Sequence, residues 1–187
     1  MIKRKHSGKD LTIFSEMTAL AQQNNAVNLS QGFPDYEVDD RLKKLLAEGT
    51  EKNFNQYAPM SGLPLLVENL ITFNQTRKIP ISLFNENITI SPGATYAIYT
   101  ALAAIVNFGN EVIVLEPSYD SYVPAIEMNG GLPVFVSLKN NFEIDFDTLK
   151  NAISEKTKAI IVNSPHNPSG KIWKKSDWDQ LASIIDS

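Results

Sequence analysis

The segment AIIVNSPHNPSG, residues 159–170, joins a short apolar run to a loop that contains two prolines and a glycine. The two X-Pro bonds and the glycine exclude a helix and a central strand after Val162, so we expect a rigid loop at the end of a buried strand. In open α/β sheets, ligands bind beyond the carboxyl ends of the strands. The segment therefore predicts a ligand-binding loop that begins near Asn163.

Helical and extended patterns alternate along the rest of the chain. We expect helices over 11–23, 39–48, 64–78, 94–105, 119–129, 145–154 and 176–186, and strands over 27–30, 87–90, 111–115, 133–138 and 158–163. Asp39 or Asp40 and Asp145 are candidate helix caps, Gly49 is a candidate stop, and Ser176 with Asp179 has the form of a capping box. This order predicts an α/β protein with three layers, α/β/α, and a mostly parallel sheet.

Composition excludes several classes of function. A net charge of −4 argues against a nucleic-acid or anionic-membrane surface, and no apolar stretch approaches the roughly 20 residues that span a bilayer. The basic residues near the N-terminus are not followed by the apolar segment of a secretory signal, so cytoplasm is the expected compartment. With no cysteine and only His6 and His166 as imidazoles, we expect no metal site.

Two motifs together resemble a known family. The NSPHNPSG loop is similar to the Asn-Pro-x-Gly loop of the fold type I pyridoxal-phosphate aminotransferases, and SQGFPDY, residues 30–36, places the chain near their kynurenine, glutamine and methionine branch. The resemblance extends from about Val27 onward. It implies a pyridoxal 5'-phosphate cofactor, amino-acid and 2-oxo-acid substrates, and a homodimer. It also implies that residues 1–30 form an arm and small-domain segment, and residues 31–187 the N-terminal portion of an incomplete cofactor-binding large domain.

Two segments resemble the family's contacts to the cofactor phosphate and ring. SPGAT, residues 91–95, joins a strand to a helix, and free N–H groups at a helix start bind anions. The resemblance places the phosphate at Gly93, Ala94 and Thr95, although any strand-glycine-helix turn has this form. Tyr119 falls where the family has its ring-stacking aromatic residue. The alternative is a tyrosine that packs in the core.

Three further residues take roles from the resemblance. Asn167 corresponds to the amide donor toward the cofactor's phenolic oxygen, or it forms an Asx turn before a proline. Tyr57 corresponds to a tyrosine that reaches the partner subunit's cofactor phosphate, or it simply packs. Gly32 corresponds to the glycine beside the substrate carboxylate, or it supplies a positive φ in a turn. His166 is expected to be a loop residue and not a catalyst.

The family's cofactor-binding lysine lies in a Ser-x-x-Lys context, which is absent after Gly170, and no arginine follows Arg77. We therefore expect a chain truncated before that lysine and inactive alone. A non-catalytic cofactor-binding or interaction module is an alternative, as is a C–S β-lyase or synthase of the same fold. A dinucleotide-binding domain with Glu116 as the ribose ligand is disfavoured because SPGAT lacks the G-x-G-x-x-G fingerprint. Aromatic, glutamine-like and methionine-like donors all remain open.

Overall fold

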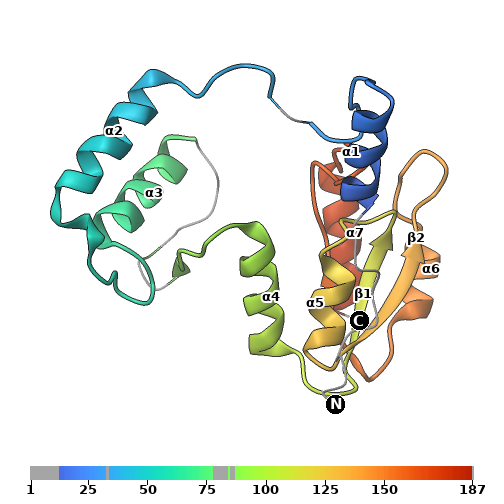
Figure 1. The fold of residues 1–187 in the computed structure, drawn as a ribbon. Helices are drawn as coiled ribbons and strands as arrows, with labels where there is room; N and C mark the ends of the chain where they lie inside the picture. Colours follow the sequence, from blue (N-terminus) through green and yellow to red (C-terminus); the bar gives the residue numbers. More distant parts are fainter. Residues whose placement is uncertain (1–12, 33, 78–83, 85–86, 187) are drawn as a thin grey trace, which may run out of the picture. The chain divides into compact units, whose positions relative to one another are not determined.

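A computed structural model of the chain describes residues 13–32, 34–77, 84 and 87–186 (Figure 1). The described residues form two compact units, one up to Ile90 and one from Ser91 onward, and each is described by itself. The expected helix residues 11, 12 and 78, and His6, lie outside the described residues. No helix within the described ranges is long and apolar enough to cross a membrane.

The second unit contains a parallel sheet. Its strands are β1 (Glu111–Glu116), β2 (Leu132–Ser137) and β3 (Thr157–Ile161), in the order β2-β1-β3. The central β1 pairs with both neighbours in the parallel sense. The carboxyl ends of the three strands therefore meet at one edge of the sheet, from which the loops after β1 and β3 both emerge. This confirms the predicted α/β class and parallel sheet.

Alternation along β1 divides the core into two layers. Val112 and Val114 pack with residues of helices α4 (Ala94–Ile105) and α5 (Tyr122–Met128) on one face. Ile113 and Leu115 pack on the other face with residues of α6 (Phe146–Ala152) and α7 (Lys175–Ile185). Burial of β1 on both sides explains why its sequence is continuously apolar. The helix–sheet–helix arrangement agrees with the predicted three layers.

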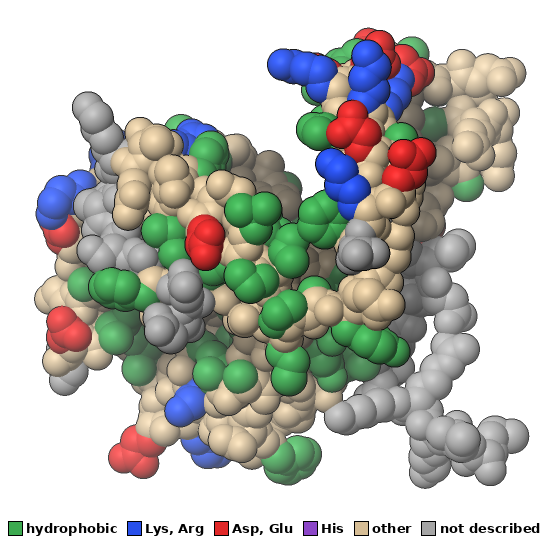
Figure 2. Space-filling view, turned by 90° about the vertical axis from the view of Figure 1, so that its left-hand side faces the viewer, with side chains coloured by type: hydrophobic (Ala, Val, Ile, Leu, Met, Phe, Trp, Pro, Cys, Tyr) green, Lys and Arg blue, Asp and Glu red, His purple; other side chains and the backbone are tan. Residues whose placement is uncertain are grey.

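The first unit is helical in its described part. It contains α1 (Ile13–Gln23), α2 (Asp40–Glu51), the short 3₁₀ helix η1 (Asn53–Asn55) and α3 (Pro64–Thr76). Asp39 caps α2 by accepting the Arg41 N–H at 2.8 Å, and Pro64 begins α3, both as predicted. The predicted stop at Gly49 is wrong, because α2 continues through it to Glu51. Figure 2, which draws both units, shows many apolar side chains on the face viewed, with charged side chains mostly toward its edges.

The two predicted strands outside the sheet are wrong. Residues 27–30 are irregular, and side-chain bonds hold them instead of a strand ladder: Asn28 Oδ1 accepts both the N–H and the hydroxyl of Ser30, at 3.0 and 2.6 Å. Residues 87–90 are also not a strand. The Ile90 N–H donates to the Ser61 carbonyl at 2.9 Å, a single bond to a loop. Both segments have apolar residues suited to a strand but no partner strand in the described chain.

Several helix limits differ from those predicted. Helix α5 begins at Tyr122 and not at residue 119, and α6 ends at Ala152 and not at Ser154. Helix α7 begins at Lys175, and the Lys174 N–H donates to Asp177 at 2.7 Å. The predicted capping box of Ser176 and Asp179 is therefore wrong. Asp179 lies one turn along the helix from Lys175 and forms an ion pair with it.

Candidate functional site

The N-terminus of α4 forms the first corner of the candidate site. Gly93 is the N-cap, with φ +96° and ψ 163°, a backbone conformation that residues other than glycine rarely adopt. Its own N–H donates to the Ser91 carbonyl at 2.8 Å, so it shapes the turn but does not offer a free donor. The first bond of the helix runs from the Ala97 N–H to the Gly93 carbonyl. The N–H groups of residues 94–96 therefore have no acceptor within the helix and can donate to a ligand at the helix start.

Tyr119 lies in the loop after β1 and meets this corner. Its hydroxyl lies 3.1 Å from the Thr95 hydroxyl, so the structure brings these two predicted site residues together. The Tyr119 ring is partly buried against the α4–α5 core layer and contacts Tyr122 edge-on, with ring centroids 5.7 Å apart. Burial, and after it the electrostatic effect of the neighbouring Tyr119, raises the pKa of the Tyr122 hydroxyl. Tyr119 thus packs against the core on one side while its polar end contacts Thr95.

Asn167 lies in the loop after β3, at the same edge of the sheet. Its N–H donates to Asn163 Oδ1 at 2.8 Å, while its own side chain is exposed. This bond is not the Asx turn of the alternative, in which the side chain of Asn167 itself would be the acceptor, because here Asn163 supplies the side chain and Asn167 the N–H. Within the described part of the chain, the side-chain amide of Asn167 has no hydrogen-bond partner. The Ser164–Pro165 and Asn167–Pro168 bonds of this loop are both cis.

His166 anchors the loop from below. It is only 4% exposed, and its ring stacks on Trp173 with centroids 5.9 Å apart. Its ring Nδ1 lies 2.8 Å from the Ser169 hydroxyl, and its backbone N–H donates to the Lys171 carbonyl at 2.8 Å. Burial lowers the pKa of the imidazole. The sequence identified His166 as a loop residue but missed its burial, which depends on a tryptophan seven positions later.

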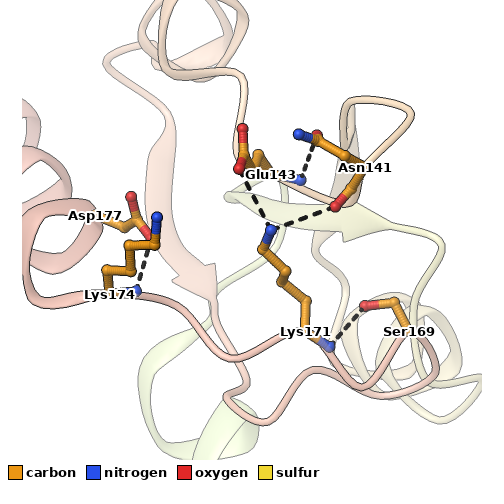
Figure 3. Close-up of polar contacts among 6 residues, drawn as sticks. All are labelled: Asn141, Glu143, Ser169, Lys171, Lys174 and Asp177. Atoms are coloured by element: carbon orange, nitrogen blue, oxygen red, sulfur yellow. Dashed lines mark hydrogen bonds and ion pairs between the residues drawn. The ribbon is translucent and has the colours of Figure 1, made fainter.

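A polar cluster connects this loop to the turn between β2 and α6 (Figure 3). Lys171 Nζ lies 3.4 Å from Glu143 Oε1 and 3.5 Å from the Asn141 carbonyl oxygen. The hydrogen bond with Asn141, together with Lys171, lowers the pKa of Glu143. Because this pair is partly exposed, it adds little to stability on its own. It connects the end of the Asn167 loop to a second loop of the same unit.

Gly32 and Tyr57 belong to the other compact unit, and their predicted roles stay predictions. Gly32 does not have a positive φ, and a Cβ added there would meet nothing within 4 Å, so it is not the left-handed turn residue of the alternative. Tyr57 is 100% exposed, which removes the packing alternative within the described chain.

A hollow of about 600 Å³ lies along β3, α6 and α7, and none of the predicted site residues lines it. Its walls are largely apolar, with Ile153, Ile160 and Leu181 among them. The candidate site is therefore the group of loops at the strand ends and not this hollow.

A sequence profile of the aminotransferase class I and II family matches residues 24–187. The chain belongs to this family. Family members depend on pyridoxal phosphate, as the two motifs had implied. The donors at the start of α4 and in the loops after β1 and β3 fit such a group. Helix N–H groups and a hydroxyl pair suit a phosphate, and a side-chain amide without a partner in the described chain suits an anionic oxygen.

Relatives of known activity match almost the whole chain. The methionine aminotransferase of Escherichia coli K12 is 42% identical over 175 residues, which are 93% of this chain and 45% of that protein. Mouse kynurenine–oxoglutarate transaminase 1 is 33% identical over 195 residues, 97% of this chain and 46% of that protein. The chain thus spans about half the length of the relatives it matches.

Solved structures give the same result. A crystal structure of an E. coli methionine aminotransferase superposes with a TM-score of 0.92 at 39% identity, covering 100% of this chain and 49% of that one. N-Succinyldiaminopimelate aminotransferase from Mycobacterium tuberculosis superposes with a TM-score of 0.89 at 33% identity, covering 99% and 49%. The fold is therefore that of the pyridoxal-phosphate aminotransferases.

Proposed function

We propose that the protein is a pyridoxal-phosphate-dependent aminotransferase that moves an amino group from an amino acid to a 2-oxo acid. The observation that carries this proposal is the contact between Thr95 and Tyr119 at the N-terminus of α4, at 3.1 Å. It joins an anion-binding helix start to an aromatic ring at the sheet edge. Pyridoxal phosphate, on which the family depends, has a phosphate that suits the first and a flat ring that suits the second.

Each residue at this edge has a separate task in the proposal. The N–H groups of Ala94 and Thr95 and the Thr95 hydroxyl hold the cofactor phosphate, while Gly93 gives the turn its shape. Tyr119 lies against the cofactor ring and excludes water from that side. Asn167 donates its amide hydrogen to the phenolic oxygen and so stabilises its anionic form. When bound, pyridoxal phosphate supplies a ring that accepts electrons from the substrate's Cα.

The other unit contributes two residues in this proposal. Gly32 lies beside the substrate carboxylate, where a missing side chain lets the ligand approach the backbone. Tyr57 donates to the cofactor phosphate of the partner subunit in a homodimer, and its full exposure is compatible with that role. We further propose a cytoplasmic enzyme.

The cofactor-binding lysine lies outside residues 1–187 in this proposal, which is supported by the coverage of only 45% of the E. coli relative. Residues 1–30 then form an arm and small-domain segment, and residues 31–187 the N-terminal portion of the large domain. We expect residues 1–187 alone not to transaminate, and the complete enzyme to do so. Methionine is the first donor to assay, because the relative with 42% identity is a methionine aminotransferase. Transamination by the 187-residue chain would contradict this assignment.

The test of the phosphate corner is the substitution Thr95→Val in the complete enzyme, with Thr100→Val on the same helix as the matched control. A hydrogen bond to a charged group is worth about 1.5–3 kcal/mol, so Thr95→Val should weaken cofactor binding about tenfold or more. Equilibrium dialysis against pyridoxal phosphate measures this. Thr100→Val should bind like the wild type. Equal affinity for all three proteins would overturn the proposed phosphate site.

A further inference from the structure

Asn163 stands at the point where β3 leaves the sheet. Strand β3 ends at Ile161, so Asn163 follows it by two residues and is partly buried at the carboxyl edge. Its side-chain oxygen accepts the Asn167 N–H at 2.8 Å. Of the hydrogen bonds among the described residues, this is the one that holds Asn167. The side chain of Asn163 thus connects the sheet to the residue that presents its amide to the site.

The remainder of the loop closes on itself around His166. The Gly170 N–H donates to the His166 carbonyl at 2.7 Å, and the His166 N–H donates to the Lys171 carbonyl at 2.8 Å. These two bonds fix the C-terminal part of the loop, residues 170 and 171, against His166. They do not reach Asn167 itself. The orientation of Asn167 therefore depends on its hydrogen bond with Asn163.

We infer that Asn163 is a positioning residue, whose side-chain oxygen holds Asn167 in the orientation that delivers its amide to the cofactor's phenolic oxygen. This inference rests on the function proposed above. Asn163 does not touch the cofactor in this account, and its effect passes through the backbone of Asn167. A change at Asn163 should therefore alter two quantities together, the affinity for the cofactor and the pH at which the bound cofactor changes its absorbance.

The direction of the pH effect follows from the charge on the cofactor's oxygen. A donated hydrogen bond stabilises the anionic oxygen and so lowers the pH at which the proton leaves. When Asn163→Leu removes the acceptor, the Asn167 amide is no longer held, and the midpoint should rise by about 0.3 to 1 pH unit. Loss of one neutral hydrogen bond should weaken cofactor binding about threefold to tenfold.

The experiment uses the complete enzyme loaded with pyridoxal phosphate, in wild-type, Asn163→Leu and Asn163→Asp forms. Asn151→Leu, an exposed position on α6, is the control for the same change of residue type. Spectrophotometric titration gives the midpoint, and equilibrium dialysis gives the affinity. Hydrogen exchange of residues 164–170 reports the bond itself, and there Asn163→Asp should match the wild type because it keeps an acceptor oxygen. If Asn163→Leu does not fold, Asn163→Ala takes its place.

The results separate this inference from the proposed function. A wild type that binds no pyridoxal phosphate contradicts the proposed function. A wild type that binds it, with the Asn163→Leu midpoint and affinity equal to those of wild type and Asn151→Leu, overturns the role of Asn163. Faster exchange in Asn163→Asp, equal to that in Asn163→Leu, also overturns it, because the acceptor oxygen would then not be what holds the loop.

Discussion

Two loops carry residues that the family resemblance assigns to the cofactor, and their own chain supports them very differently. The loop over 163–171 rests on His166, which is 4% exposed, and its Asn167 is held by a side chain at the strand end. The loop over 56–63 carries Tyr57 and Met60, both 100% exposed. Asn167 is thus held by a side chain of its own loop, whereas no described residue covers the ring of Tyr57. This difference is what the proposal of a shared dimer site requires.

The second loop is nevertheless fixed at its end. The Gly62 N–H donates to the Pro59 carbonyl at 2.9 Å, and Gly62 has φ +119°. Pro64 then begins α3 directly. The turn into the helix is therefore determined by its own sequence, although side chains before and after it, such as Tyr57 and Leu65, are exposed. A rigid exit with an exposed tyrosine suits a residue that contacts another subunit.

The largest expected effect concerns the base of the first loop. Trp173 is 5% exposed and contacts both His166 and Trp178. Trp173→Ala should lower the free energy of unfolding by about 3–5 kcal/mol, through lost packing and the cavity left behind. Tyr57→Ala, the matched change in the second loop, should lower it by less than about 0.5 kcal/mol. Urea unfolding of the complete enzyme without bound cofactor measures both free energies, and equal losses would remove the contrast between the loops.

The next effect concerns which subunit Tyr57 serves. Tyr57→Phe removes only the hydroxyl, so it should weaken cofactor binding about tenfold. The free energy of unfolding of the cofactor-free protein should stay unchanged within about 0.5 kcal/mol. Mixed dimers of one Tyr57→Phe subunit and one Asn167→Ala subunit show where it acts. A tyrosine that serves the partner leaves one site intact and one doubly impaired. Two sites that are each impaired by one substitution would contradict the shared site in a cofactor titration.

The smallest effect is a pH dependence at His166. Burial lowers its pKa below the ordinary 6.5, so the unfolded chain binds more protons between that lowered pKa and 6.5. The contribution of His166 to stability is thus complete above pH 6.5 and falls as the pH drops through this window. Urea unfolding at pH 7.5 and 5.5 should show a larger loss in the wild type than in His166→Asn. An equal loss in both would exclude this contribution.

The sequence predicted those parts of the fold that depend on local pattern. The apolar run before Glu116 predicted β1, the spacing of Ala94 to Ile105 predicted α4, and the prolines after Val162 predicted the loop. The parallel sheet followed from the order of these elements. The segments 27–30 and 87–90 have the composition of strands, but strand formation needs a partner, which a local pattern does not specify.

The candidate site was predicted through the family motifs and not through geometry. The motifs gave Thr95 and Tyr119, but their 3.1 Å contact joins residues 24 positions apart and needed the folded sheet edge. Asn163 was missed, although an asparagine four residues before Asn167 in a proline-rich loop is a signal for a side-chain turn. The burial of His166 depends on stacking with Trp173, which only tertiary structure reveals.

In the proposed function, the N-terminus of α4 and the loops after β1 and β3 together hold one phosphorylated ring. A crystal structure of the complete enzyme grown with pyridoxal phosphate tests it most directly. We expect phosphate oxygens within hydrogen-bonding distance of the Ala94 and Thr95 N–H groups, the ring against Tyr119, and the side-chain amide of Asn167 at the phenolic oxygen. A cofactor bound elsewhere, with its phosphate away from the start of α4, would contradict it.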